Sequence, residues 1–162
     1  MEGLKRAAVF CILHCEDSFL LLKRGKNPNK SKFVPPGGKI ESYESPYDAM
    51  LREVKEETGL DLTEVKFCGV LSETSPTSYN WISFIYTATI PRVEKIVCDE
   101  GEFYWIPKSE VLNTDIPPAD KYIYQFVANQ QAFFLNAIYD KNLIMTEISD
   151  ELSGEILFKN EG

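Results

Sequence analysis

Three glutamates carry the first chemical signal in this sequence, because Glu53, Glu56 and Glu57 recur at positions i, i+3 and i+4. On a helix this spacing projects all three carboxylates to one side. Like charges so arranged destabilise a bare helix by roughly 0.2–0.5 kcal/mol per pair. A hard divalent cation such as Mg2+, which prefers oxygen ligands, would relieve that repulsion. The run therefore indicates a metal site or, as is commoner for acidic helix faces, a solvated surface.

The residues before this helix favour the metal site. Gly37 and Gly38 have no side chain, so a backbone carbonyl could approach a metal closely there. Glu41 and Glu44 add carboxylates in the connecting loop, and Arg52 can hydrogen-bond a neighbouring carboxylate and fix its direction. A loop, a helix and a second loop would thus bring oxygen ligands to one point.

Local signals define the helix that carries the glutamates, which is predicted over residues 45–58. Ser45 is a suitable N-cap, Pro46 occupies the favoured first position and Asp48 completes a capping pattern. Gly59 is the expected C-terminal stop. An apolar stripe would bury one face of the helix in the core: Tyr47, Met50, Leu51 and Val54.

The other predicted elements are strands and one further helix. A second helix is predicted over residues 120–139, with Ile123, Val127, Phe134 and Ile138 along one face. Strands interleaved with two helices predict an α/β sandwich with a mixed sheet between helices. The strands are expected at residues 7–15, 19–23, 65–72, 81–90, 103–106, 143–148 and 155–158.

The composition limits the class of function. The 162 residues carry 17 basic and 25 acidic side chains, for a net charge of −8. No basic face is therefore expected, and a nucleic-acid polymer is not expected as a partner. A phosphorylated ligand would need a bound cation to neutralise it. Four cysteines without a CxxC pair, and a single histidine, argue against structural zinc and favour reduced thiols.

The sequence shows no sign of membrane insertion or export. No apolar run approaches the ~20 residues that span a bilayer, and no signal-peptide cleavage site of the small-residue kind is found. We therefore expect a cytoplasmic protein without a membrane partner, and either a monomer or a homodimer.

The segment from Gly38 to Leu60 resembles the Nudix box. Gly38 is followed after five residues by Glu44, and after seven more by the run from Arg52 to Leu60, which reads REVKEETGL. Every defining position of the box is filled. The resemblance implies a Nudix hydrolase: a Nudix-type α/β/α sandwich forming a single domain over residues 1–162, with the box as a loop, a helix and a loop.

The resemblance also implies roles for the box residues. Glu56 and Glu57 would be the principal ligands of Mg2+, for which Mn2+ could substitute, and Glu53 would be a ligand or would orient the attacking water. The carbonyl of Gly37 or Gly38 would complete the metal's ligands. The residues that brace these carboxylates would be Arg52, Glu44 and Glu41.

Residues outside the box are candidates for phosphate binding and for a further base. Lys23, Arg24 and Lys39 could hold phosphate oxygens, although each could equally be a solvated side chain. Members of the family often draw another carboxylate from a loop between late strands. Glu100 is the candidate here, and an ordinary acidic turn is the alternative.

Segments flanking the box resemble the Nudix enzymes that hydrolyse oxidised purine nucleoside triphosphates, such as 8-oxo-dGTP, to a monophosphate and pyrophosphate. These segments are residues 33–41, 105–107 and 115–120. Asp120 would read the edge of the base, or would only cap its helix. The residues that could stack on the base, unless they belong to the core, are Trp81, Phe84 and Tyr122.

Two other functions stay open. An ADP-ribose or nucleotide-sugar pyrophosphatase is the rival enzyme, because Pro76 lies close to where ADP-ribose-cleaving relatives carry a proline; a turn would also favour proline there. A nucleotide sensor without turnover is the rival from another class. Degenerate relatives of that kind usually lose box glutamates, whereas all three are present here.

Overall fold

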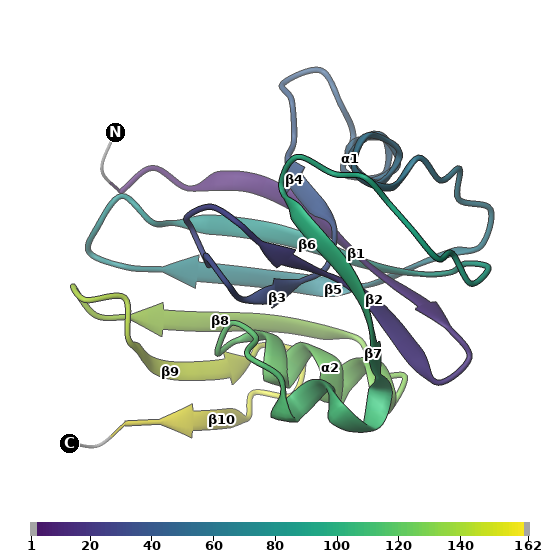
Figure 1. Cartoon of the computed structure of the whole chain (residues 1–162). Helices are drawn as coiled ribbons and strands as arrows, with labels where there is room; N and C mark the ends of the chain where they lie inside the picture. Colours follow the sequence, from purple (N-terminus) through teal and green to yellow (C-terminus); the bar gives the residue numbers. More distant parts are fainter. Residues whose placement is uncertain (1–2, 161–162) are drawn as a thin grey trace.

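Buried residues of β1 (Arg6–Cys15) belong to two different core clusters, one on each face of the sheet. The computed structural model describes residues 3–160. Val9 belongs to a buried cluster that includes residues of α1 (Pro46–Thr58), whereas Ile12 belongs to a second cluster that includes residues of α2 (Asp120–Ala128). Because alternate strand residues face opposite sides, the two helices cover opposite faces of the sheet (Figure 1).

One mixed sheet joins the strands of the described residues. They are β2 (Ser18–Arg24), β3 (Phe33–Val34), β4 (Gly37–Lys39), β5 (Val65–Thr74), β6 (Trp81–Thr89), β7 (Gly101–Pro107), β8 (Phe133–Tyr139), β9 (Met145–Asp150) and β10 (Ile156–Lys159). The order is β10-β9-β8-β5-β6-β1-β2-β3, with β4 paired to β1 and β7 paired to β2. The pairs β1–β6 and β5–β8 are parallel and the others antiparallel. The predicted α/β architecture with a mixed sheet between helices is confirmed.

The residues predicted to begin and end α1 do so in the structure. The Oγ atom of Ser45 accepts a hydrogen bond from the backbone N–H of Asp48 at 3.1 Å, and Pro46 begins the helix. Gly59 ends it at φ 77°, a left-handed conformation that favours glycine. Both caps are made by residues close in sequence, which fixes where the box glutamates lie along the helix.

The prediction of one helix over residues 120–139 is wrong beyond Ala128. Gln130 has φ 53°, which interrupts the helix, and the chain then forms β8 parallel to β5. Burial in β8 alternates from residue to residue. Phe134 and Ile138, placed in the sequence on a helical stripe, are therefore the less buried residues of a period-2 pattern. The short 3-10 helix η1 (Lys108–Asn113) precedes α2.

A change of partner along one edge of β1 opens the sheet next to the box. Ala8 to Phe10 pair with β4, whereas Leu13 to Cys15 pair with β2. In β4, the backbone N–H of Gly37 donates to Glu57, near the carboxyl end of α1. No helix in residues 3–160 is long and apolar enough to cross a membrane.

Candidate active site

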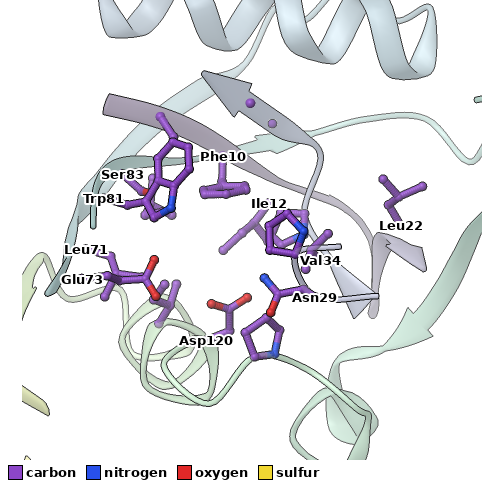
Figure 2. A pocket seen from close by; sticks show the side chains of 18 of the residues that line it. Phe10, Ile12, Leu22, Asn29, Val34, Leu71, Glu73, Trp81, Ser83 and Asp120 are labelled. Carbon is purple, nitrogen blue, oxygen red and sulfur yellow. The ribbon is translucent and has the colours of Figure 1, made fainter. Parts of the chain in front are cut away.

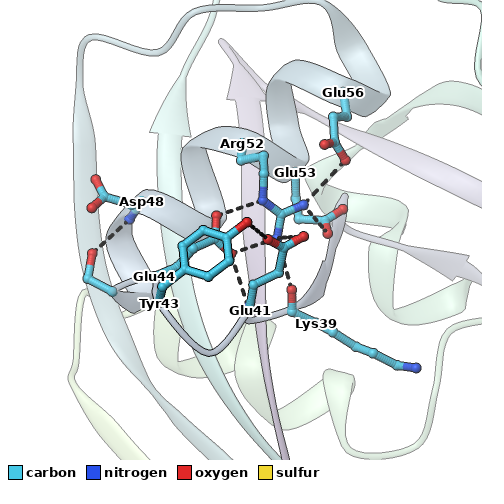
Figure 3. Close-up of polar contacts among 9 residues, drawn as sticks. Lys39, Glu41, Tyr43, Glu44, Asp48, Arg52, Glu53 and Glu56 are labelled. Atoms are coloured by element: carbon cyan, nitrogen blue, oxygen red, sulfur yellow. Dashed lines mark hydrogen bonds and ion pairs between the residues drawn. The ribbon is translucent and has the colours of Figure 1, made fainter.

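Arg52 is the centre of the polar network on α1. Its Nε and Nη2 atoms donate to the two carboxylate oxygens of Glu44 at 2.7 and 2.8 Å. Its Nη1 atom donates to Glu53 at 2.9 Å and to Glu56 at 3.4 Å, and Nη2 also reaches the carbonyl of Lys39 at 3.1 Å. Figure 3 shows the guanidinium surrounded by these groups. Arg52 thus fixes the loop and the helix to each other.

The loop carboxylates of Glu44 and Glu41 extend this network. The hydrogen bonds from Arg52 hold the pKa of Glu44 below its usual value. Glu44 also accepts from the backbone N–H of Glu41 at 3.0 Å. Glu41 lies 4.0 Å from Arg52 and accepts a hydrogen bond from the Tyr43 hydroxyl. Charge-assisted bonds of this kind set the direction of a carboxylate as well as its charge.

Glu57 is the most buried of the three helix glutamates. It is 9% exposed, and it accepts a hydrogen bond from the backbone N–H of Gly37 at 3.2 Å. Burial, and then the negative charge of Glu53, raises the pKa of Glu57 to about 8. Burial also raises the pKa of Glu53. Two neighbouring acids that resist ionisation mark a place where a positive charge would bind favourably.

The two glycines are required for a reason that the sequence does not reveal. A Cβ atom on Gly38 would lie 2.5 Å from the Oε1 atom of Glu53. A Cβ atom on Gly37 would overlap the carbonyl of Val9. Both positions therefore keep space for neighbouring groups, and the space beside Gly38 is filled by the carboxylate of a predicted metal ligand.

Acidic side chains outnumber basic ones around this point. Glu56 turns toward Arg52 and Glu57 toward Gly37, so no three acidic, histidine or cysteine side chains within residues 3–160 already form a metal cage. Nevertheless, the donors are carboxylates and carbonyls, and the charge of Glu53 adds to the cost of ionising Glu57. Hard oxygen donors with surplus negative charge suit Mg2+ or Mn2+. The residues present therefore fit a divalent cation.

Glu100, the candidate for a further carboxylate, lies close to this group. The negative charge of Glu100 helps to raise the pKa of Glu57, whereas the positive charge of Arg24 lowers the pKa of Glu57. Glu100 lies 3.7 Å from Arg24 and 4.0 Å from Lys26. Its carbonyl accepts from the backbone N–H of Gly25 at 3.0 Å, which ties the loop before β7 to the end of β2.

A cavity of about 230 Å³ connects the box with the α2 face of the sheet. Its lining at the box end includes Glu57, Gly37 and Gly38. Trp81 and Asp120, the two predicted base-binding residues it contains, appear in Figure 2. Arg24 and Lys39, predicted to bind phosphate, line it as well. Residues predicted for the metal, the phosphates and the base thus share one space.

Three predicted substrate-binding residues do not line this cavity. Lys23 is exposed and lies over the ring of Phe33, 5.7 Å from its centroid. Phe84 points to the α1 face of the sheet, because its neighbours Ser83 and Ile85 are the residues that face the cavity. Tyr122 packs against the core cluster of the α2 face. Their positions give no support to binding in this cavity.

Two residues that line the cavity were not predicted from the sequence. Glu73 is a buried acid in β5, and it accepts a hydrogen bond from Tyr139 at 2.7 Å. Asn29 has φ 61°, and its side chain points into the cavity near Asp120 (Figure 2). A glutamate at the end of an apolar strand was a signal for Glu73, but nothing in the sequence marked Asn29.

The environment of Asp120 predicts that the stability of the protein depends on pH. Burial, and then the charge of Glu73, raises the pKa of Asp120 to about 8. From about pH 4 to pH 8 the folded state therefore binds more protons than the unfolded state. The free energy of unfolding should fall as the pH rises, at most by about 1.4 kcal/mol per pH unit. Glu57, whose pKa is also raised to about 8, adds a slope of the same sign. We therefore expect Asp120→Asn to have a shallower slope than the wild type in urea titrations with chelator, and the exposed Asp115→Asn to keep the wild-type slope. An unchanged slope in Asp120→Asn would contradict the assignment.

Comparisons with known proteins identify the family of this chain. Residues 4–127 match the family model of the NUDIX domain. The chain is 29% identical over 126 residues to the uncharacterized Nudix hydrolase YvcI of Bacillus subtilis, which covers 75% of this chain and 78% of that protein. The structure of a mutator MutT protein from Bacillus halodurans has a TM-score of 0.79 and 26% identity, covering 91% of this chain and 98% of that one.

Two shorter matches carry different substrate names. An ADP-ribose pyrophosphatase of Methanocaldococcus jannaschii is 43% identical over 65 residues, which is 40% of this chain and 38% of that protein. An 8-oxo-dGTP diphosphatase of Proteus vulgaris is 39% identical over 78 residues, which is 48% of this chain and 69% of that protein. The family model covers most of the chain and contains the whole Arg52 network, so the chain belongs to the Nudix hydrolases.

Proposed function

We propose that the protein hydrolyses a phosphoanhydride bond in purine nucleoside triphosphates, including oxidised ones, to release the monophosphate and pyrophosphate. One observation carries this proposal: a single cavity contains Glu57 and the box glycines together with Trp81 and Asp120. A mainly apolar pocket with a few polar groups suits a base. The carboxylates beside it suit the metal-dependent chemistry of phosphates.

Mg2+, or Mn2+ in its place, would be held by box residues. The ligands we assign are Glu53, Glu56, Glu57 and a carbonyl of Gly37 or Gly38. When bound, the cation would neutralise phosphoryl oxygens and lower the pKa of a water molecule.

The chain's own part in the reaction is to position groups and to place charge. Arg52 holds Glu53 and Glu56 in fixed directions. Arg24 and Lys39 supply positive charge in the cavity for phosphate oxygens. Glu100, close to Glu57 and Arg24, is the group we assign as a further base or metal ligand.

Asp120 and Trp81 would hold the base. Asp120 keeps its proton at neutral pH because its pKa is raised to about 8, so its carboxyl group can donate a hydrogen bond to a base carbonyl. Trp81 offers an aromatic surface in the same cavity. A small-molecule nucleotide is therefore the ligand that this cavity suits best.

A panel of substrates tests this function. We expect kcat/KM for 8-oxo-dGTP or dGTP to exceed the values for ADP-ribose, nucleotide sugars and dinucleoside polyphosphates. If ADP-ribose were hydrolysed faster than every triphosphate, the ADP-ribose pyrophosphatase suggested by the relative in Methanocaldococcus jannaschii would be the correct function. Tight binding of a nucleotide without turnover of any compound would identify a sensor.

A further inference from the structure

Two carboxyl groups lie in a cavity whose other lining is mainly apolar. Glu73 comes from β5 and Asp120 begins α2, and Figure 2 shows both carboxyl groups directed into the cavity, with that of Glu73 extending toward Asp120. The cations among its described lining residues are Arg24 and Lys39. Lys39 lies in β4 and Arg24 pairs with Glu100, so both belong to the box end. Neither acid pairs with these two cations, and Lys5, outside the lining, contacts the backbone carbonyl of Glu73 at 2.7 Å.

Glu73 accepts hydrogen bonds from two tyrosines. It is 9% exposed, and its Oε2 atom accepts from the Tyr139 hydroxyl at 2.7 Å. The Tyr79 hydroxyl lies 3.3 Å from the same oxygen and 3.5 Å from Oε1. Donors of this kind favour the ionised carboxylate. Because a carboxylate can accept about four hydrogen bonds, capacity is left for a ligand.

Asp120 complements Glu73 as a donor. Within residues 3–160, the carboxyl group of Asp120 has no hydrogen-bond partner. The buried hydroxyl of Tyr124, which lines the same cavity, also has no partner among these residues. Burial raises the pKa of both acids, but tyrosine hydroxyls lower that of Glu73 and none lowers that of Asp120. Asp120 is therefore the better placed of the two to donate a hydrogen bond, and Glu73, which already accepts from two tyrosines, to accept one.

We propose that Glu73 is a specificity-determining residue that accepts hydrogen bonds from the N–H groups of a purine base, while Asp120 donates to the adjacent carbonyl. The inference rests on the proposed function, because it takes this cavity as the base pocket. The edge of guanine or 8-oxoguanine presents a carbonyl, a ring N–H and an amino group in that order. Adenine presents an amino group beside a ring acceptor, which leaves Glu73 without its donors.

Binding of nucleoside monophosphates tests this inference without requiring turnover. Titration calorimetry with Mg2+ present would compare dGMP with dIMP, which lacks the amino group, and with AMP. A hydrogen bond to a charged acceptor predicts that dGMP binds about 10- to 100-fold more tightly than dIMP. In Glu73→Gln, and in Glu73→Asp with its shorter side chain, the ratio should fall below about threefold.

A control separates this role from a general loss of charge or structure. Glu147→Gln removes a glutamate that pairs with Lys159 on the outer strands, 3.6 Å away, and should keep the wild-type ratio. Equal binding of dGMP and dIMP to the wild type, no binding of either, tighter binding of AMP, or an unchanged ratio in a folded Glu73→Gln protein would each overturn the inference. Failure of triphosphate hydrolysis alone would instead overturn the proposed function, since the binding ratio is measured separately.

Discussion

Replacing Glu57 by glutamine is expected to lower kcat by about 1000-fold and to leave the fold intact. The amide has nearly the shape of the carboxylate and can still accept the hydrogen bond from Gly37. Ionised Glu57 is costly in the folded protein, because burial raises its pKa to about 8. An uncharged residue should therefore not lower the melting temperature in chelator. Steady-state kinetics with Mg2+ and thermal unfolding would measure the two effects.

Asp48→Asn is the matched control on the same helix. Asp48 is exposed in the first turn, and its contribution to the cap is its backbone N–H, which the substitution keeps. We expect kcat within a factor of about two of wild type, because exposed substitutions away from a site have small effects. Near-normal turnover in a folded Glu57→Gln protein would show that the catalytic centre lies elsewhere.

Arg52→Lys should lower kcat by about 10- to 100-fold, the usual cost of removing a group that orients a metal ligand, and should lower the melting temperature. Lysine keeps the positive charge but cannot reproduce the two-pronged contact with Glu44 while also reaching Glu53. The loop carboxylate and the helix carboxylate would then lose their common partner. Kinetics and thermal unfolding would again be measured together.

Arg92→Lys provides the same substitution at another place. Arg92 is exposed and lies 4.7 Å from the centroid of the Trp105 ring, a contact that lysine can also make. Its kcat should stay close to that of the wild type. If Arg52→Lys had the same kcat as Arg92→Lys, positioning by the guanidinium would have no part in the reaction.

The box helix could be predicted from the sequence because its determinants are local. Ser45 caps the helix by accepting from the backbone N–H three positions later, and Gly59 ends the helix by adopting a left-handed conformation. The spacing of Glu53, Glu56 and Glu57 then follows from helix geometry alone. Nothing distant in the chain is needed to place these side chains on one face. The reaction class was predicted from the resemblance of residues 38–60 to the Nudix box, whose positions are likewise close together in the chain.

The end of α2 depends on contacts that local patterns do not encode. Residues 133–139 contain aromatic and aliphatic side chains that fit a helical stripe at Phe134 and Ile138. Pairing with β5, which lies far earlier in the chain, makes them a strand and buries the alternate residues instead. Tertiary pairing overrides a local helical pattern in this way because strand formation is strongly context-dependent.

The cavity was the least predictable part of the site. Glu73 accepts its shortest hydrogen bond from Tyr139, 66 positions away, and it faces Asp120 from another element. The restriction on Gly38 likewise arises from Glu53 on the following helix. Sequence spacing could indicate the chemistry of the box, but the groups that would select a substrate meet only in the folded chain.

Metal dependence tests the central claim most directly. The initial rate of pyrophosphate or phosphate release from the best substrate should be measured with Mg2+, with excess chelator, and after chelation followed by added Mg2+ or Mn2+. The surplus negative charge around Glu53 and Glu57 predicts no turnover in chelator and full recovery on adding either ion. Equal turnover in excess chelator would contradict the assignment of the box as a divalent-metal site.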